Sequence, residues 1–376
     1  MRRVWLGVVA LTVVAATGGQ AHGMNGRCAQ ALPHGVKVPA PIVVTTQCGR
    51  FRLQPGGQAV FEGPRTLPVP KGSDYFMDLT WYRFSRGRHL LIGRGLKQLW
   101  RSHDRYPFTR ANSVGAVVVG AHELAFSYGG RLYRARYGEP ERLVARAEDP
   151  VALFSGQLLS RRLHGWALVL RGTGKVVVRH AVEPQWDRAA GMVVFRTGRR
   201  LRAFDGRRVR LLANRYDLGV KGNPVVEPLG RFVSLHDRRR LVLVGYEGRV
   251  VASTPLPKAR TQDDVVSSAV TSNAAGTGVA FTATHRWNSR ETVYLLAAGS
   301  RRAHALFSAR PDIGGCGYVA SVAWHGRWLL YSSGDQRATI LDSGRREASV
   351  NLAPVIARLP GRRRDGLFNI AWAPAP

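Results

Sequence analysis

The sequence predicts an all-β fold, a β-propeller of seven or eight four-stranded blades. Apolar runs of about five or six residues recur along the chain between Gly-containing turns, most clearly from Val319 to Val350. No helical periodicity of useful length is present. The first runs of successive sets begin near residues 76, 114, 153, 188, 224, 267, 320 and 368, so the period is 35 to 53 residues. A small sheet cannot bury both faces alone, and repeats at this spacing favour a propeller over a sandwich or two barrels.

The two ends of the chain are expected to share one blade. The apolar run at 367–372 has no hairpin after it, and the strands expected within 42–63 have no inner strand before them. Pairing the two segments would close the propeller and leave no terminal strand edge unpaired. The strand count favours eight blades, whereas seven would require the set at 153–182 to merge with a neighbour.

The N-terminus has the pattern of an export signal. Arg2 and Arg3 precede an apolar segment from Val4 to Ala16, and Gly19-Gln20-Ala21 has the form of a cleavage site. The apolar segment is shorter than the roughly 20 residues that a membrane span needs. We therefore expect an exported monomer, extracellular or associated with the cell envelope, without a transmembrane segment after cleavage. The expected organisation is a signal peptide over 1–21, an irregular segment over 22–41 and a single β-propeller domain over 42–376.

The composition is strongly basic. Lys and Arg number 56 against 24 Asp and Glu, which gives a formal net charge of +32. Only six of the 56 are Lys, which leaves 50 Arg. Both residue types serve in phosphate contacts, so this imbalance indicates a GC-rich coding bias rather than selection for phosphate binding. The charge will nevertheless attract anionic polymers non-specifically at low salt.

Three cysteines in an exported chain predict one disulfide and one spare thiol. Cys28 with Cys48 would close a short N-terminal loop, whereas Cys48 with Cys316 would join the closing blade to a neighbouring loop. Sequence alone leaves the pairing open. No cysteines have Cys-x-x-Cys spacing and no His lies four residues from another, so we expect no metal site and no cofactor.

Part of the chain resembles a known repeat. Ser321-Val322-Ala323-Trp324, followed by Gly326 and Leu329-Leu330-Tyr331, is similar to the repeat of TolB-like and WD40-like propellers of bacterial envelopes. Asn369-Ile370-Ala371-Trp372 matches its first half. The Ser-Pro-Asp-Gly turn of that repeat is replaced by His325-Gly326-Arg327, and most other sets lack the Trp. The resemblance implies a propeller that binds partners rather than one that catalyses a reaction.

The connections leading into the expected inner strands carry eight of the 14 Asp residues. They would lie on one face of a propeller, together with Arg and aromatic residues suited to a protein or glycan partner. The alternative is that each Asp only fixes a turn by bonding its own backbone. The predicted binding face consists of Asp104, Arg105, Tyr106, Asp149, Asp187, Arg215, Tyr216, Asp217, Arg260, Asp263, Asp264, Trp287, Arg310, Asp312 and Asp365.

Catalytic motifs are weak. His103-Asp104 and His236-Asp237 are adjacent pairs, whose side chains point to opposite sides of a strand, so we assign no catalytic residue. The sequence therefore predicts a non-catalytic binding or scaffold module at the cell envelope. The alternative is a propeller hydrolase or lyase acting on a glycan or lactone. It requires at least two of Asp217, Asp263, Asp264 and Asp312 to lie within about 5 to 10 Å of each other.

Overall fold

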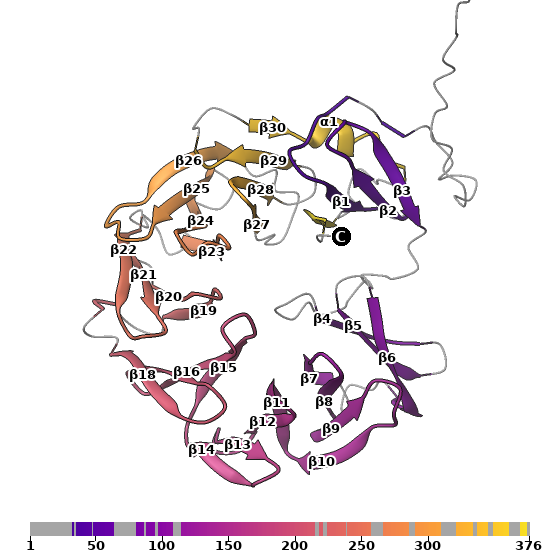
Figure 1. Cartoon of the computed structure of the whole chain (residues 1–376), viewed down its shortest axis with the longest axis vertical. Coiled ribbons are helices and arrows are strands. Elements are labelled where there is room, and N and C mark those ends of the chain that lie inside the picture. Colours follow the sequence, from indigo (N-terminus) through magenta and orange to yellow (C-terminus); the bar gives the residue numbers. More distant parts are fainter. Residues whose placement is uncertain are drawn as a thin grey trace, which may run out of the picture. The chain divides into compact units, whose positions relative to one another are not determined.

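The protein is described from a computed structural model (Figure 1). It describes residues 32–33, 35–46, 48–63, 80–85, 88–94, 97–107, 114–214, 218–220, 224–237, 239–256, 266–285, 290–309, 321–333, 337–344, 349–360 and 369–373. The chain forms two compact units, one of Met1–Arg65 with Leu352–Pro376 and one of Thr66–Asn351. The expected signal peptide lies outside the described residues, and the single domain over 42–376 stays a prediction. No helix in the described part of the chain is long and apolar enough to cross a membrane.

The first unit is one four-stranded antiparallel sheet with a short helix. Its strands are β1 (Ile42–Thr45), β2 (Arg50–Leu53), β3 (Ala59–Gly63) and β31 (Asn369–Trp372), in the order β3-β2-β1-β31, and α1 spans Ala353–Ile356. The C-terminal strand β31 pairs with β1 in the register Ile42↔Trp372 to Thr45↔Asn369. The prediction that both ends of the chain share one blade is therefore confirmed.

The second unit contains seven antiparallel sheets that follow one another in chain order. Its strands, sheet by sheet, are β4 (Thr80–Phe84), β5 (His89–Arg94), β6 (Lys97–Arg105); β7 (Val114–Val119), β8 (Glu123–Tyr128), β9 (Arg131–Arg136), β10 (Arg142–Arg146); β11 (Glu148–Phe154), β12 (Gln157–Arg162), β13 (Leu168–Arg171), β14 (Lys175–Val178); β15 (Val182–Asp187), β16 (Met192–Thr197), β17 (Arg200–Phe204), β18 (Val209–Asn214); β19 (Val225–Pro228), β20 (Phe232–His236), β21 (Arg240–Gly245), β22 (Val250–Pro255); β23 (Val266–Ser272), β24 (Gly278–His285), β25 (Arg290–Ala297), β26 (His304–Ala309); β27 (Ser321–His325), β28 (Trp328–Ser333), β29 (Arg337–Asp342) and β30 (Ser349–Asn351).

Neighbouring sheets of the second unit pack through alternating apolar residues. The first strands lie beside one another, β4 with β7, β7 with β11, β11 with β15, β15 with β19 and β23 with β27 (Figure 1). Because side chains alternate between the two faces of a strand, each sheet contributes to two apolar layers. Val233 and Leu235 of β20 pack toward β15–β18, whereas Phe232 packs toward β23–β25.

The described strands form eight sheets, seven with four strands and one, β4–β6, with three. An eight-bladed β-propeller agrees with this count, and the set at 148–178 is a separate sheet rather than part of a neighbour. Two boundaries differ from expectation. The third set begins at Glu148 rather than near 153. The fourth set begins at Val182 rather than near 188, because β15 contains Pro184 and has no continuous apolar run. A first strand can carry Pro where its N–H needs no partner in the ladder.

Candidate functional site

Many residues of the predicted binding face lie outside the described part of the chain. They are Arg215, Tyr216, Asp217, Arg260, Asp263, Asp264, Trp287, Arg310, Asp312 and Asp365. Cys48 forms a disulfide, and both candidate partners, Cys28 and Cys316, also lie outside the described residues, so the pairing stays a prediction.

The three described aspartates of the predicted face lie at different ends of their strands. Asp149 is the second residue of β11, whereas Asp187 is the last residue of β15. Asp104 lies near the end of β6, the third strand of its sheet. β6 runs parallel to the first strand, β4, because both pair antiparallel with β5. The sequence predicted that these three side chains would lie at one end of the sheets. In the structure they do not. The misplaced start of β15 explains the difference for Asp187.

Asp187 connects two neighbouring sheets. Its carboxylate is buried and accepts hydrogen bonds from the backbone N–H groups of Ala190 and Gly230 and from the hydroxyl of Tyr246, the last at 2.5 Å. Burial, followed by the bond to this carboxylate, raises the pKa of Tyr246 far above its usual value. Asp187 thus stabilises the packing of β15–β18 against β19–β22.

Tyr106 has a similar role beside β6. It is buried, with its ring against Phe126 and Tyr128, and its hydroxyl donates to Glu141 at 2.8 Å. Burial and then this bond raise the pKa of Tyr106. Glu141 also accepts the backbone N–H groups of His103 and Asp104, while the side chains of Asp104 and Arg105 are exposed.

Asp149 is held within the β7–β14 region. Its carboxylate accepts a 2.6 Å hydrogen bond from Ser127 and lies 3.6 Å from the guanidinium of Arg161. A Cβ added at Gly115 would meet both Ser127 and Asp149, so the backbone approaches this pair closely. Only Asp187 bonds nearby backbone, through the N–H of Ala190, as the alternative for these aspartates expects. The role of the three aspartates in binding stays a prediction.

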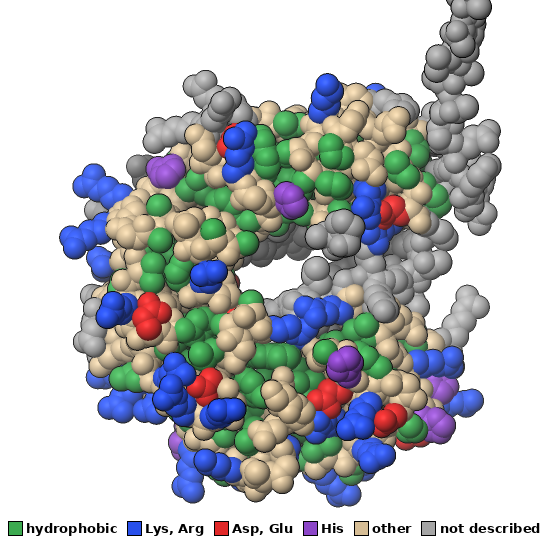
Figure 2. Space-filling model, in the orientation of Figure 1, with side chains coloured by type: hydrophobic (Ala, Val, Ile, Leu, Met, Phe, Trp, Pro, Cys, Tyr) green, Lys and Arg blue, Asp and Glu red, His purple; other side chains and the backbone are tan. Residues whose placement is uncertain are grey.

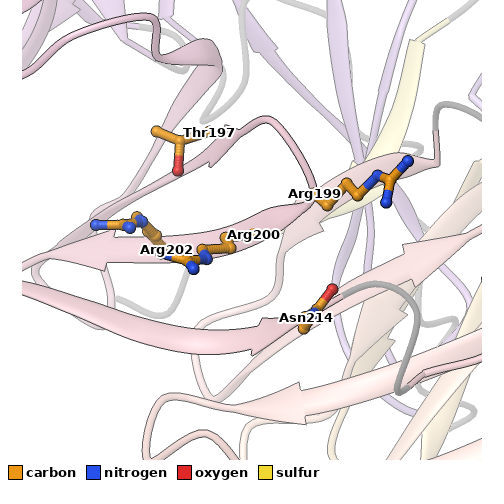
Figure 3. A pocket seen from close by; sticks show the side chains of 5 residues that line it. All are labelled: Thr197, Arg199, Arg200, Arg202 and Asn214. Atoms are coloured by element: carbon orange, nitrogen blue, oxygen red, sulfur yellow. The ribbon is translucent and has the colours of Figure 1, made fainter.

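A different group of residues forms a hollow on the sheet β15–β18. It has a volume of about 460 Å³ and is lined by Thr197, Arg199, Arg200, Arg202 and Asn214 (Figure 3). Three of these side chains are arginines and none is a carboxylate. The arrangement can donate hydrogen bonds to a ligand and bind negative charge, but it offers no general base.

Strand register brings these residues together. Thr197 and Asn214 lie opposite Arg200 on the two flanking strands, and Arg202 follows Arg200 on the same face of β17. The β16–β17 hairpin has a two-residue loop whose first residue, Gly198, has φ of +56°, a conformation that favours glycine. The alternation also places Phe204, two residues beyond Arg202, in the apolar layer shared with β11–β14.

Arg200 and Arg202 differ from two other arginines of their sheet, which pair with carboxylates. Arg196 pairs with Glu183 at 2.9 Å, and Arg210 pairs with Asp205 at the same distance. Burial acts to raise the pKa of Asp205, but the N–H groups of Arg208 and Arg207 and the guanidinium of Arg210 outweigh it and lower the pKa to about 2.

Within the described residues, Arg200 and Arg202 have no such carboxylate partner. Thr197 Oγ1 and Arg202 Nε are buried and form no hydrogen bond. Unpaired buried donors are costly, so a site that leaves them without partners is suited to an acceptor from outside. Figure 3 shows Arg199 directed away from the other two arginines.

A second polar cluster lies on the face of β19–β20 that packs toward β23–β25. Glu227 is opposite Ser234, and His236 follows Ser234 on the same face. Glu227 Oε2, Ser234 Oγ and His236 Nε2 are buried and have no hydrogen-bond partner. Burial raises the pKa of Glu227; burial lowers that of His236, against the opposing charge of Asp237. Ser234 is completely buried and not bonded to His236, so the cluster does not contain the activated nucleophile that covalent catalysis needs.

No group of three His, Cys, Asp or Glu side chains is positioned to hold a metal ion among the described residues. The Asp217, Asp263, Asp264 and Asp312 carboxylates on which the hydrolase alternative depends are outside that part of the chain.

No protein-family model and no curated protein sequence matches the chain. Similar solved structures exist. AztD from Citrobacter koseri, in its apo form, has a TM-score of 0.50 and 8% identity over 83% of this chain and 94% of its own. The fold is a β-propeller. BamB from Moraxella catarrhalis has a TM-score of 0.42 and 14% identity, covering 74% of this chain and 87% of its own. Hsv2 from Kluyveromyces lactis has a TM-score of 0.47 and 9% identity, covering 71% and 91%. AztD, BamB and Hsv2 are β-propeller proteins, and at this identity the likeness concerns the fold alone.

The hollow was not predicted from the sequence. A signal was present in the spacing: Arg200 and Arg202 alternate with the apolar Leu201 and Ala203 on one predicted strand. The two-residue spacing puts both guanidinium groups on one face, but only the register with Thr197 and Asn214 shows what surrounds them.

Proposed function

We propose that the protein is a non-catalytic binding module that recognises an anionic partner, a protein or a glycan, at the cell envelope. The observation that carries the proposal is the hollow at Thr197, Arg200 and Arg202, which contains hydrogen-bond donors without partners. The export signal expected over 1–21 supports the location, and the propeller fold supplies a rigid support for the site.

Specific binding in the hollow must be distinguished from the general attraction of anions to the basic surface. Figure 2 shows Lys and Arg side chains spread over the visible surface, with fewer acidic ones among them. Such a surface attracts any polyanion weakly, and salt screens this attraction over a Debye length of about 10 Å at 0.1 M. A specific partner would instead depend on the geometry of the hollow and would remain bound at higher salt.

The test is capture of a partner from envelope extract by the immobilised mature chain, from roughly 50 to 500 mM salt. We expect a defined species that survives high salt and is lost when Arg200 and Arg202 are both replaced by Ala. The matched control replaces the exposed Arg301 and Arg302 by Ala, which removes the same charge elsewhere. Equal loss in both double variants, or turnover of a glycan or lactone without a captured partner, would overturn the proposal.

A further inference from the structure

We infer that the hollow on β15–β18 is a phosphate-binding site, which takes the phosphate group of a phosphorylated glycan or free phosphate. This inference rests on the proposed function and names the chemical group that the site recognises. It starts from Arg200 and Arg202, which lie on one face of β17, two residues and therefore about 7 Å apart along the strand. Two guanidinium groups at that spacing can both reach one small anion.

Like charges favour an anion between them. Arg200 and Arg202 line one hollow without a carboxylate among the lining residues, so their charges repel one another. Arg202 is partly buried, where screening by water is weaker than at the surface. An anion in the hollow would offset that repulsion. A coding bias toward arginine explains exposed arginines in general, but it does not explain two arginines on one face of β17 beside a buried hydroxyl that has no partner.

The donors suit phosphate better than a carboxylate. Each guanidinium is a planar fork that bonds phosphate or carboxylate oxygens in pairs. The hollow adds the buried hydroxyl of Thr197, which has no partner in the structure. Two guanidinium forks and a hydroxyl supply more hydrogen-bond donors than the two oxygens of a carboxylate are suited to accept. A phosphate offers three terminal oxygens and a charge near −2. The volume of about 460 Å³ leaves room for an attached sugar.

The deciding experiment is calorimetric titration of the full mature chain at constant ionic strength with inorganic phosphate, glucose 1-phosphate and acetate. We expect both phosphates to bind at least about tenfold more tightly than acetate. We expect R200A/R202A to weaken phosphate binding at least about tenfold, while R301A/R302A leaves it unchanged. Arg202→Lys, which keeps the charge and is less disruptive to folding, should weaken binding because an ammonium lacks the fork.

The two phosphate ligands distinguish the sources. Tighter binding of glucose 1-phosphate assigns the site to a phosphorylated glycan, and equal binding assigns it to free phosphate. Acetate binding as tightly as phosphate, or equal loss in the two double variants, would overturn the assignment. If a partner is captured but phosphate does not compete for it, the phosphate site is wrong and the binding module stands. If phosphate binds and no partner is captured, the binding module is wrong and the phosphate site stands.

Discussion

Two buried serines of the second unit differ in their hydrogen bonding and should respond differently to the loss of their hydroxyl group. Ser234 Oγ has no partner, whereas Ser127 Oγ accepts the N–H of Ala116 and donates to Asp149. Both residues are buried, with exposed fractions of 0% and 3%. We expect Ser234→Ala to leave stability unchanged or raise it slightly, because no bond is lost. Ser127→Ala should cost about 1–3 kcal/mol, since it leaves buried groups without partners. Denaturant unfolding of both variants measures the difference, and equal destabilisation would contradict it.

His236 should make stability depend on pH. Burial lowers its pKa in the folded state, partly opposed by Asp237, so the unfolded chain binds more protons just below the ordinary histidine value near 6.5. Stability is therefore complete above that value and falls as the pH drops through it toward the lowered pKa. Glu227, on the same face, has a raised pKa. Its contribution to stability therefore has the opposite sign and increases as the pH falls through that raised value. Thermal midpoints measured from about pH 7.5 to 5.5 should fall less in His236→Gln than in the natural chain; an identical fall would contradict the prediction.

At the scale of elements, side-chain hydroxyls connect neighbouring sheets. Tyr246, which follows β21, donates to Asp187 at the end of β15, and Tyr331 of β28 donates to Glu291 of β25. Each bond joins a carboxylate on one sheet to a tyrosine on the next. Apolar layers set the spacing between sheets, but they do not fix which residue faces which; directional bonds of this kind do.

Removing the Tyr246 hydroxyl tests that role. Tyr246→Phe should destabilise the protein by about 1.5–3 kcal/mol, the range for hydrogen bonds to charged groups, because Asp187 loses one of its donors. Tyr133→Phe is the matched control, since no hydrogen bond of the Tyr133 hydroxyl is present in the described structure. Chemical denaturation compares the two variants. A loss of the same size at Tyr133 would show that the hydroxyl matters through packing rather than through Asp187.

The sequence predicted these elements better than it predicted the site. Alternation and Gly turns located the strands, and most first strands begin within a few residues of the expected positions. β11 and β15 begin five or six residues earlier than expected, and in β15 Pro184 interrupts the apolar pattern. The hollow was not predicted since Thr197 and Asn214 reach Arg200 only through the register of three strands. Spacing within one strand shows which residues share a face, but it does not show what lies beside them.

At the scale of the whole molecule, the pairing of β31 with β1 connects the two ends of the described chain. Four residue pairs join the strands, from Ile42↔Trp372 to Thr45↔Asn369. Ile370 is buried at 9% exposure, opposite the fully buried Val44. Thr46, just after β1, also donates to the carbonyl of Pro360 at 2.6 Å. The first unit is therefore built from segments more than 300 residues apart in the sequence.

Deleting β31 should destabilise the first unit specifically. A chain ending at residue 368 loses the β1–β31 ladder and the buried Ile370 side chain, whose removal alone would cost about 2–5 kcal/mol. It also exposes β1 as an unpaired strand edge, which favours association with other chains. The control is a chain ending at residue 373, which keeps the whole of β31. Hydrogen exchange should then show faster exchange of the β1 and β2 amides in the shorter chain only, while amides of β19–β21 stay protected. Equal protection of β1 in both chains would mean that the rest of the first unit holds this strand without its C-terminal partner.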